Sequence, residues 1–204
     1  MFCGGSWSPD GERVTCASFG DPSRNGIYSL RASDGGGVTR ITSNPDGEDL
    51  AGDYSPDGTR LVLVRSQEDR PVGYFVTNVD GSGLRQLTPP DMLLDDSRFA
   101  GRWSPDGNDI LLVARSAETH HKAIWIVDAD SGAPEELPIE PACGGPMADP
   151  DSFGCYSPDW SPDGNKIVFT RSDGDTENIY MVNADGTGIV QITDGEDDNP
   201  DWGT

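Results

Sequence analysis

The chain repeats one stretch of sequence, whose clearest copy, Trp160–Thr193, reads WSPDGNKIVFTRSDGDTENIYMVNADGTGIVQIT. Each copy opens with an aromatic residue and Ser-Pro-Asp-Gly. This tetrapeptide predicts a tight turn, because Pro presets φ and Asp and Gly suit the positions after it. The opening aromatic residues are spaced by 47, 49 and 57 positions. They are Trp7, Tyr54, Trp103 and Trp160.

Three strands are predicted after each turn. The first follows the turn directly, the second follows a polar loop, and a short outer strand follows a hairpin turn such as Asp185–Gly188. Together with the strand before the aromatic residue, each repeat reads as a four-stranded antiparallel meander. The predicted strands are Arg13–Ser18, Arg60–Arg65, Asp109–Arg115 and Lys166–Arg171, then Gly26–Ala32, Gly73–Val79, Ala123–Val127 and Asn178–Val182, and the outer Val38–Thr42, Leu84–Thr88, Glu135–Ile139 and Val190–Thr193.

Four-stranded units that recur every 40 to 50 residues or so are typical of a β-propeller. No helical periodicity competes with this pattern. We therefore expect a single all-β domain over residues 1–204, a β-propeller of four-stranded antiparallel blades. The approximate repeat limits are 7–53, 54–102, 103–159 and 160–201, and residues 199–204 are expected to start a further inner strand.

The best repeat closes with Asp-Asn-Pro-Asp-Trp at residues 198–202. With its Ser-Pro-Asp-Gly turn, Ile-Tyr strand, Asp-Gly-Thr-Gly hairpin and Gln-Ile-Thr, it resembles the TolB-like propellers, also called PD40 or WD40-like repeats. The resemblance covers nearly all of residues 7–202. It implies a bacterial protein-binding propeller, since the family includes the periplasmic TolB protein, which docks a lipoprotein. The family also includes domains attached to peptidases and carbohydrate-active enzymes.

The number of repeats leaves the complete ring open. The TolB protein that this chain resembles has a six-bladed ring and an added N-terminal domain, whereas four complete repeats are present here. An open end of a propeller leaves unpaired strand edges and uncovered blade faces. The alternatives are a closed ring of four blades, part of a larger ring, and a ring completed by oligomerisation through the terminal strands.

The charge of the chain excludes several classes of partner. It has 14 Lys and Arg against 36 Asp and Glu, for a net charge of −22. This charge opposes binding to nucleic acid and to anionic membranes. No segment approaches the roughly 18 apolar residues of a membrane helix, so we expect no membrane insertion. The first residues show no signal-peptide pattern, so we expect a cytosolic protein, a mature form or a piece of a longer protein.

Acidic loops are expected to gather on one face. In a propeller, the loops that lead into the next inner strand share a face with the loops between the two middle strands, and both kinds are acidic here. Such a surface suits a basic or amide-rich protein segment. The candidate partner-binding residues are Asp46, Asp95, Asp96, Asp173, Asp175, Glu177 and Asp194.

Two acidic pairs in these loops are candidates for a metal site. Glu48-Asp49 and Glu196-Asp197 occupy equivalent positions before an inner strand, and Asp198 follows the second pair. Clustered carboxylates favour a hard cation such as Ca²⁺. The alternative is a solvated acidic surface, because no EF-hand spacing is present. His120-His121 is the one histidine pair. Family members resembling oligogalacturonate lyases use histidines with a divalent ion, but here we favour an exposed loop.

The four cysteines offer two candidate disulfides. Cys143 and Cys155 flank an insertion in the third repeat, and we expect a disulfide across it. Cys3 and Cys16 are the second candidate pair, with a buried free thiol as the alternative for Cys16. Two disulfides would indicate an oxidising compartment, so we expect a periplasmic or extracellular location.

The sequence shows no catalytic motif: there is no nucleophile elbow, zinc-protease motif, P-loop or dinucleotide fingerprint. The first hypothesis is therefore a non-catalytic propeller that binds a protein partner through its acidic loop face. The second is a calcium-binding propeller in which the ion stabilises or assembles the blades. The third is the propeller portion of a larger hydrolase or lyase.

Overall fold

The computed structural model of the chain describes residues 5–90, 92, 94, 101–115, 122–139, 143, 153–173, 175–195 and 197–202. Within these ranges the chain forms fifteen strands and no helix. The described part of the chain accordingly contains no helix with the length and apolar character needed to cross a bilayer. The predicted all-β fold is confirmed.

The strands form four consecutive antiparallel blades. In the first blade, a bridge between Trp7 and Val14 occupies the place of an inner strand. A single parallel bridge between Lys122 and Gly154 joins the third and fourth blades into one eight-stranded sheet. The blades contain β1 (Arg13–Ser18), β2 (Gly26–Arg31) and β3 (Thr39–Arg40); β4 (Gly47–Tyr54), β5 (Arg60–Gln67), β6 (Arg70–Asn78) and β7 (Arg85–Gln86); β8 (Arg102–Trp103), β9 (Asp109–Arg115), β10 (Lys122–Asp128) and β11 (Pro134–Glu136); and β12 (Phe153–Trp160), β13 (Lys166–Asp173), β14 (Glu177–Asn183) and β15 (Val190–Gln191).

The same hydrogen bonds hold the Ser-Pro-Asp-Gly turn of each blade. In the second blade, Ser55 Oγ donates to Asp57 Oδ1 at 2.6 Å and accepts from the backbone N–H of Arg60 at 2.9 Å. The backbone N–H of Thr59 donates to the same carboxylate. These bonds, chiefly the one from Ser55, lower the pKa of Asp57 to about 2. The aspartates of these turns are therefore structural. Their counterparts are Asp10, Asp106 and Asp163.

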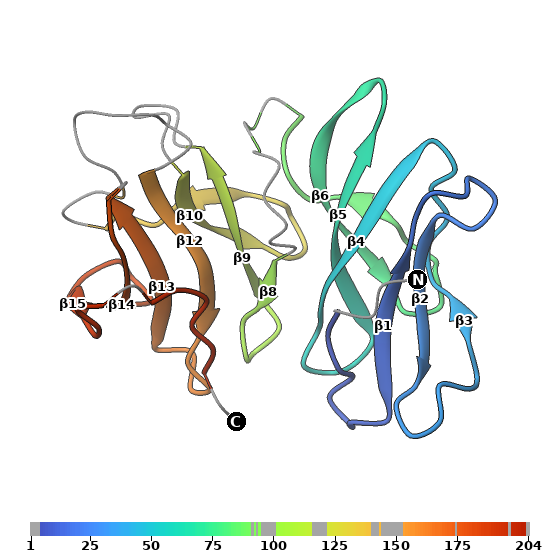
Figure 1. The fold of residues 1–204 in the computed structure, drawn as a ribbon, viewed down its shortest axis with the longest axis horizontal. Coiled ribbons are helices and arrows are strands. Elements are labelled where there is room, and N and C mark those ends of the chain that lie inside the picture. The colour runs from blue at the N-terminus through green and yellow to red at the C-terminus, as the bar shows by residue number, and fades with distance from the viewer. Residues whose placement is uncertain are drawn as a thin grey trace.

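The four blades follow one another in an open arc (Figure 1). Each blade packs on the next, since β1 and β2 contact β4, β4 contacts β8, and β8 and β9 contact β12. The first blade lies at one end of the arc and the fourth at the other, and no ring is closed. The closed four-bladed ring, one of the three alternatives, is therefore wrong for this structure.

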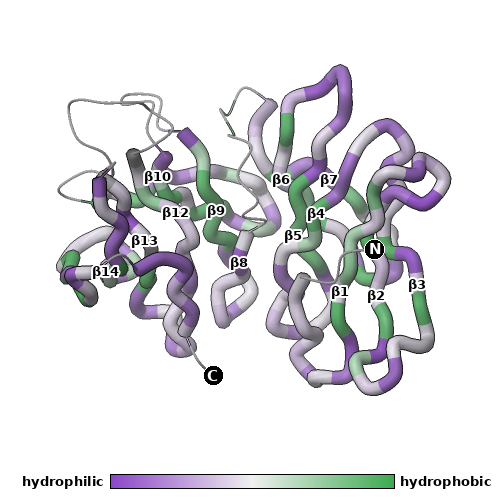
Figure 2. The backbone as a smooth tube through the Cα atoms, in the orientation of Figure 1, coloured by the Kyte–Doolittle hydropathy of each residue, from purple (hydrophilic) through white to green (hydrophobic). Residues whose placement is uncertain are grey.

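The core consists of three apolar layers, one between each pair of neighbouring blades. Apolar residues run along the middle of the blades, and hydrophilic residues predominate in the loops (Figure 2). The aromatic residues Tyr54, Trp103 and Trp160 are 6%, 4% and 8% exposed, and each lies in the layer shared with the preceding blade. Their packing between blades is as predicted. Trp7, at the same position of the first blade, is 61% exposed.

Candidate functional site

The antiparallel strand order gives the arc two opposite faces. The loop face carries the loops between the two middle strands, such as residues 68–69, and the segments that lead into the next inner strand, such as residues 41–46. The turn face carries the Ser-Pro-Asp-Gly turns and the hairpins before the outer strands, such as residues 79–84. We use these two names below.

Most described members of the candidate partner-binding set lie exposed on the loop face. Asp46, Asp175 and Asp194 are exposed, and Glu177 is half-buried at the start of β14. A hydrogen bond from the Tyr156 hydroxyl reaches Glu177, and burial together with this carboxylate raises the pKa of Tyr156. Asp173 is the last residue of β13, its side chain lies outside the described part, and so do Asp95 and Asp96.

The candidate metal residues do not share one environment. Glu48, Asp197 and Asp198 are exposed, and Glu196 lies outside the described residues. Asp49 is fully buried within β4, where the sequence suggested an exposed loop. In the described ranges, no group of three or more His, Cys, Asp or Glu side chains is arranged to hold a metal ion. His120 and His121 also lie outside them.

Asp49 is neutralised inside the protein. Arg65 Nη2 lies 2.8 Å from Asp49 Oδ2, and Arg65 Nε donates to Oδ1 at the same distance. Thr42 Oγ1 and Asn44 Nδ2 also donate to this carboxylate, at 2.5 and 3.0 Å. Because one guanidinium and two neutral donors occupy both oxygens, Asp49 anchors the start of β4 to β5.

Sequence reasoning missed a row of polar residues on the inner strands, each just before an aromatic residue. Ser6 Oγ accepts the backbone N–H of Tyr54 at 3.1 Å, and Asp159 Oδ2 accepts that of Trp202 at 3.0 Å. Asp53 Oδ2 faces the backbone N–H of Trp103 at 3.4 Å. Each acceptor therefore links its blade to the aromatic residue of the next. The signal was present in the sequence, because the position before each aromatic residue of the repeat is polar.

Arg102 occupies this position in the third blade. Its guanidinium lies 3.8 Å from Asp159 and attracts both Asp53 and Asp159. Burial nevertheless raises the pKa of Asp53 to about 6 and also raises that of Asp159. The inner strands thus hold two partly desolvated carboxylates around a single guanidinium.

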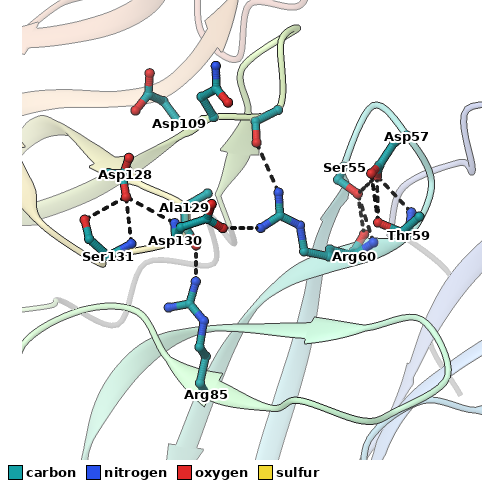
Figure 3. Close-up of polar contacts among 12 residues, drawn as sticks. Ser55, Asp57, Thr59, Arg60, Arg85, Asp109, Asp128, Ala129, Asp130 and Ser131 are labelled. Atoms are coloured by element: carbon teal, nitrogen blue, oxygen red, sulfur yellow. Dashed lines mark hydrogen bonds and ion pairs between the residues drawn. The ribbon is translucent and has the colours of Figure 1, made fainter.

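Two arginines close the turn face between the second and third blades (Figure 3). Arg60 Nη1 lies 2.9 Å from Asp130 Oδ1, and Arg60 Nη2 donates to the carbonyl oxygen of Gly107 at 3.2 Å. Its guanidinium carbon lies 4.6 Å from the centre of the Trp103 ring. Arg85 donates to the carbonyl oxygen of Ala129. The junction is therefore covered by cationic side chains of the second blade.

Grooves lie at the turn face of the other two junctions. One, of about 390 Å³, lies between the first and second blades and is lined by Arg13, Tyr54 and Gly58, among others. The second, of about 540 Å³, lies between the third and fourth blades. Its lining includes Asp106, Asp109, Ile126, Trp160, Asp163 and Ala184.

Two of the cysteines link segments near the fourth blade. Cys143 and Cys155 form a disulfide with Cα atoms 5.3 Å apart, which ties the chain before the fourth blade to β12. Cys16 is fully buried in β1 and is also disulfide-bonded. Its predicted partner, Cys3, lies outside the described residues.

No protein-family model matches the sequence. The chain is 30% identical over 179 residues to an uncharacterized protein of Agrobacterium fabrum, covering 81% of this chain and 53% of the relative. It is 28% identical over 154 residues to an uncharacterized peptidase of Bacillus subtilis, covering 70% and 19%. It is 25% identical over 198 residues to the Tol-Pal system protein TolB of Francisella tularensis, covering 95% and 41%. The chain thus spans about half or less of each of these relatives.

Solved structures agree on the fold. TolB from Acinetobacter baumannii superposes with a TM-score of 0.70 at 19% identity, over 92% of this chain and 42% of that one. A putative TolB from Agrobacterium tumefaciens gives 0.68 at 24% identity, over 93% and 61%. Both likenesses support a propeller arrangement of the blades.

Proposed function

Because this chain belongs to the TolB-like β-propeller repeat family, we propose that it is a non-catalytic scaffold whose acidic loop face binds a protein partner. The observation that carries the proposal is the exposure of Asp194, Asp197 and Asp198 on that face. None of the three forms an ion pair with a described residue, whereas Asp49 on the same side of the arc is neutralised by Arg65. A basic or amide-rich segment of the partner would supply the missing donors.

Affinity capture tests this role. The chain, immobilised at physiological salt, is exposed to an envelope extract of the source organism, and the retained proteins are identified. Replacing Asp194, Asp197 and Asp198 together by Asn should remove the specific partner. The matched control neutralises two exposed acids near the turn face, Glu12→Gln and Glu135→Gln, and should keep it. Retention of every partner by the triple variant would count against the proposal.

The location proposed for this role is the periplasm or the exterior of a bacterial cell. The Cys143–Cys155 disulfide and the disulfide-bonded state of Cys16 support it, because disulfides persist in oxidising compartments. Labelling of free thiols in protein taken directly from the source organism tests the location. Quantitative labelling of cysteines without reduction would contradict it.

Calcium binding is the alternative proposal for the same face. It rests on the exposure of the candidate carboxylates Glu48, Asp197 and Asp198, which leaves their oxygens accessible to a hard cation. An ion that binds only the folded state raises the melting temperature by mass action. A melting temperature that is the same in millimolar calcium and in EDTA would eliminate this alternative.

The ends of the arc support a proposal about assembly. Trp7 is 61% exposed and Ile192 is 53% exposed, whereas their counterparts inside the arc, such as Trp103 and Leu87, are buried between blades. We propose that further blades of the same kind cover the two exposed ends of the arc, supplied by a longer chain or by a second copy through the terminal strands. Light scattering on the 204-residue chain distinguishes the two, since only the second gives a dimer or larger ring.

The B. subtilis relative favours one further candidate role, because its name describes it as a peptidase. In that case, the chain would be the propeller portion of a larger hydrolase. A reading frame that continues into a catalytic module, with peptidase activity in the full-length protein only, would support this role over the scaffold.

A further inference from the structure

The junction between the third and fourth blades has the same hydrogen-bond acceptors as the junction between the second and third. The Gly107 carbonyl, which accepts from Arg60, corresponds to that of Gly164 at the end of the next Ser-Pro-Asp-Gly turn. Ala129 corresponds to Ala184, since their backbone N–H groups donate to the carbonyl oxygens of Asn108 and Asn165, at 2.8 and 2.9 Å respectively. Asp185 follows Ala184 as Asp130 follows Ala129.

The residues opposite these acceptors differ. They are basic at the junction between the second and third blades and acidic at the junction between the third and fourth. Asp109 stands where Arg60 stands, because the backbone N–H of each donates to the Ser Oγ of its own turn at 2.9 Å. Glu135 stands where Arg85 stands, and each lies opposite the same position of the neighbouring strand, Ile126 or Val76. The third blade therefore presents carboxylates to acceptors that, one junction earlier, receive guanidinium groups.

No cationic side chain of the described residues pairs with Asp109. Its carboxylate forms no hydrogen bond or ion pair with any described residue, and across the β9–β10 pair it faces Asp128. Partial burial, together with Asp106 and Asp128, raises the pKa of Asp109. The location of Asp109 and Asp128 near the turn face is visible in Figure 3. A positive group in the groove would remove this repulsion.

The groove has room for a guanidinium and an aromatic residue in its lining. It measures about 540 Å³, and Trp160 forms part of the lining, as Trp103 lies under Arg60. An aromatic face attracts a guanidinium by stacking and by its quadrupole. The groove between the first two blades lacks this character, because Arg13 lines it and binds its own blade at Ser29 and Gly37.

We propose that the groove between the third and fourth blades binds the guanidinium group of an arginine side chain of a partner, which occupies it as Arg60 occupies the preceding junction. The guanidinium stacks on Trp160, pairs with Asp109 and reaches the Gly164 carbonyl. Arginine fits better than lysine because its planar fork serves a carboxylate and a carbonyl at once. This site lies on the turn face, so it is separate from the acidic loop face.

The probe is N-acetyl-arginine amide, titrated into ¹⁵N-labelled protein and followed by NMR. We expect saturable shifts at the Trp160 indole and the Gly164 amide, with the Trp103 indole unchanged. The neutral isostere N-acetyl-citrulline amide should leave these signals in place. Asp109→Asn should weaken the binding of the arginine probe by roughly fivefold to tenfold, as expected for one lost charge pair.

Asp109→Arg provides the sharper variant, because it should fold with its own guanidinium in the groove and abolish the saturable shifts. Asp194→Asn on the loop face should not alter the titration, which keeps this proposal independent of the scaffold role. Unchanged binding by Asp109→Arg, or equal binding of the citrulline probe, would overturn the proposal. So would calcium chloride that gives the same shifts and displaces the arginine probe, since the groove would then be a metal site.

Discussion

The junction between the second and third blades and the junction between the third and fourth share one kind of apolar layer but differ in their polar contacts. In the first, Arg60 and Arg85 reach across, and the Trp103 indole N–H donates to the carbonyl oxygen of Asp53 at 3.1 Å. In the second, the Trp160 indole N–H is buried and has no hydrogen-bond partner among the described residues.

The second junction has other connections. The Cys143–Cys155 disulfide lies in its apolar layer, and the parallel bridge from Lys122 to Gly154 joins the two sheets. One repeat sequence therefore joins its blades in two ways: Arg60 and Arg85 span one junction at the turn face, whereas a disulfide, a backbone bridge and the Arg102–Asp159 ion pair link the other. Polar contacts at the rim are free to vary as long as the apolar layer stays intact.

The disulfide should have the largest effect on this comparison. The double variant Cys143→Ala, Cys155→Ala removes a cross-link over a sequence separation of 12. Its loss should lower the free energy of unfolding by about 3 kcal/mol, because the unfolded chain gains loop entropy. Urea denaturation measures this loss, and the double variant spares the disulfide of Cys16, which a reducing agent would break. A loss below about 1 kcal/mol would show that the non-covalent contacts suffice.

Asp53 makes the junction between the second and third blades sensitive to pH. Its pKa is raised from 3.8 to about 6, so the folded state binds its proton more tightly than the unfolded state does. Its contribution to stability is therefore full below pH 4 and is lost as pH rises through 6. Asp53→Asn should stabilise the protein above pH 6 by about 2 kcal/mol and change little below pH 4. Denaturation curves from pH 4 to 8 test this, and a variant with the parent's pH dependence would contradict it.

Arg60→Ala should weaken only the junction between the second and third blades. It removes an ion pair with an exposed carboxylate, which is worth little, and a stacked guanidinium that covers Trp103. We expect a loss of about 1 to 2 kcal/mol in the free energy of unfolding, mostly from packing. Arg13→Ala is the matched control, because the hydrogen bonds of Arg13 to described residues go to Ser29 and Gly37 of its own blade. Equal losses for both variants would mean that Arg60 does not act across the junction.

Asp109→Arg should make the junction between the third and fourth blades resemble the junction between the second and third. It removes the like charges that face each other across β9 and β10 and offers a guanidinium to Gly164 and Asp185. The gain should be about 0.5 to 1 kcal/mol, detected as a higher melting temperature than that of Asp109→Asn. Because the gain comes from charges, it should shrink in high salt. A destabilised Asp109→Arg variant would show that the groove does not admit a guanidinium.

Much of the fold could be predicted because each repeat records it locally. The Ser-Pro-Asp-Gly turn fixes where one strand ends and the next begins, and the main strands lie close to their predicted limits. The outer strands are shorter than predicted, such as Thr39–Arg40 in place of Val38–Thr42. Ile41 and Leu87, just after the outer strands, are buried between blades, whereas Val38 and Leu84, just before them, are exposed, and alternation alone does not reveal this difference.

The candidate site was harder to predict because it depends on register. Asp49 pairs with Arg65 across β4 and β5, beyond a shift in register between Ala51 and Tyr54. An alternating pattern gives no sign of such a bulge, so Asp49 read as one more loop carboxylate. Asp194 and Asp198 lie outside the strands and are exposed, so their exposure does not depend on strand register. Sequence therefore identified the acidic face better than it identified which acids are already neutralised.

The outer strands have a consequence for solubility. β3, β7 and β15 are two residues long and β11 is three, so the outer edge of every blade offers very few free ladder positions. An edge this short does not template a strand from another molecule, which is how exposed sheets begin to aggregate. A net charge of −22 adds repulsion between molecules. The outer edges of the blades therefore do little to promote aggregation.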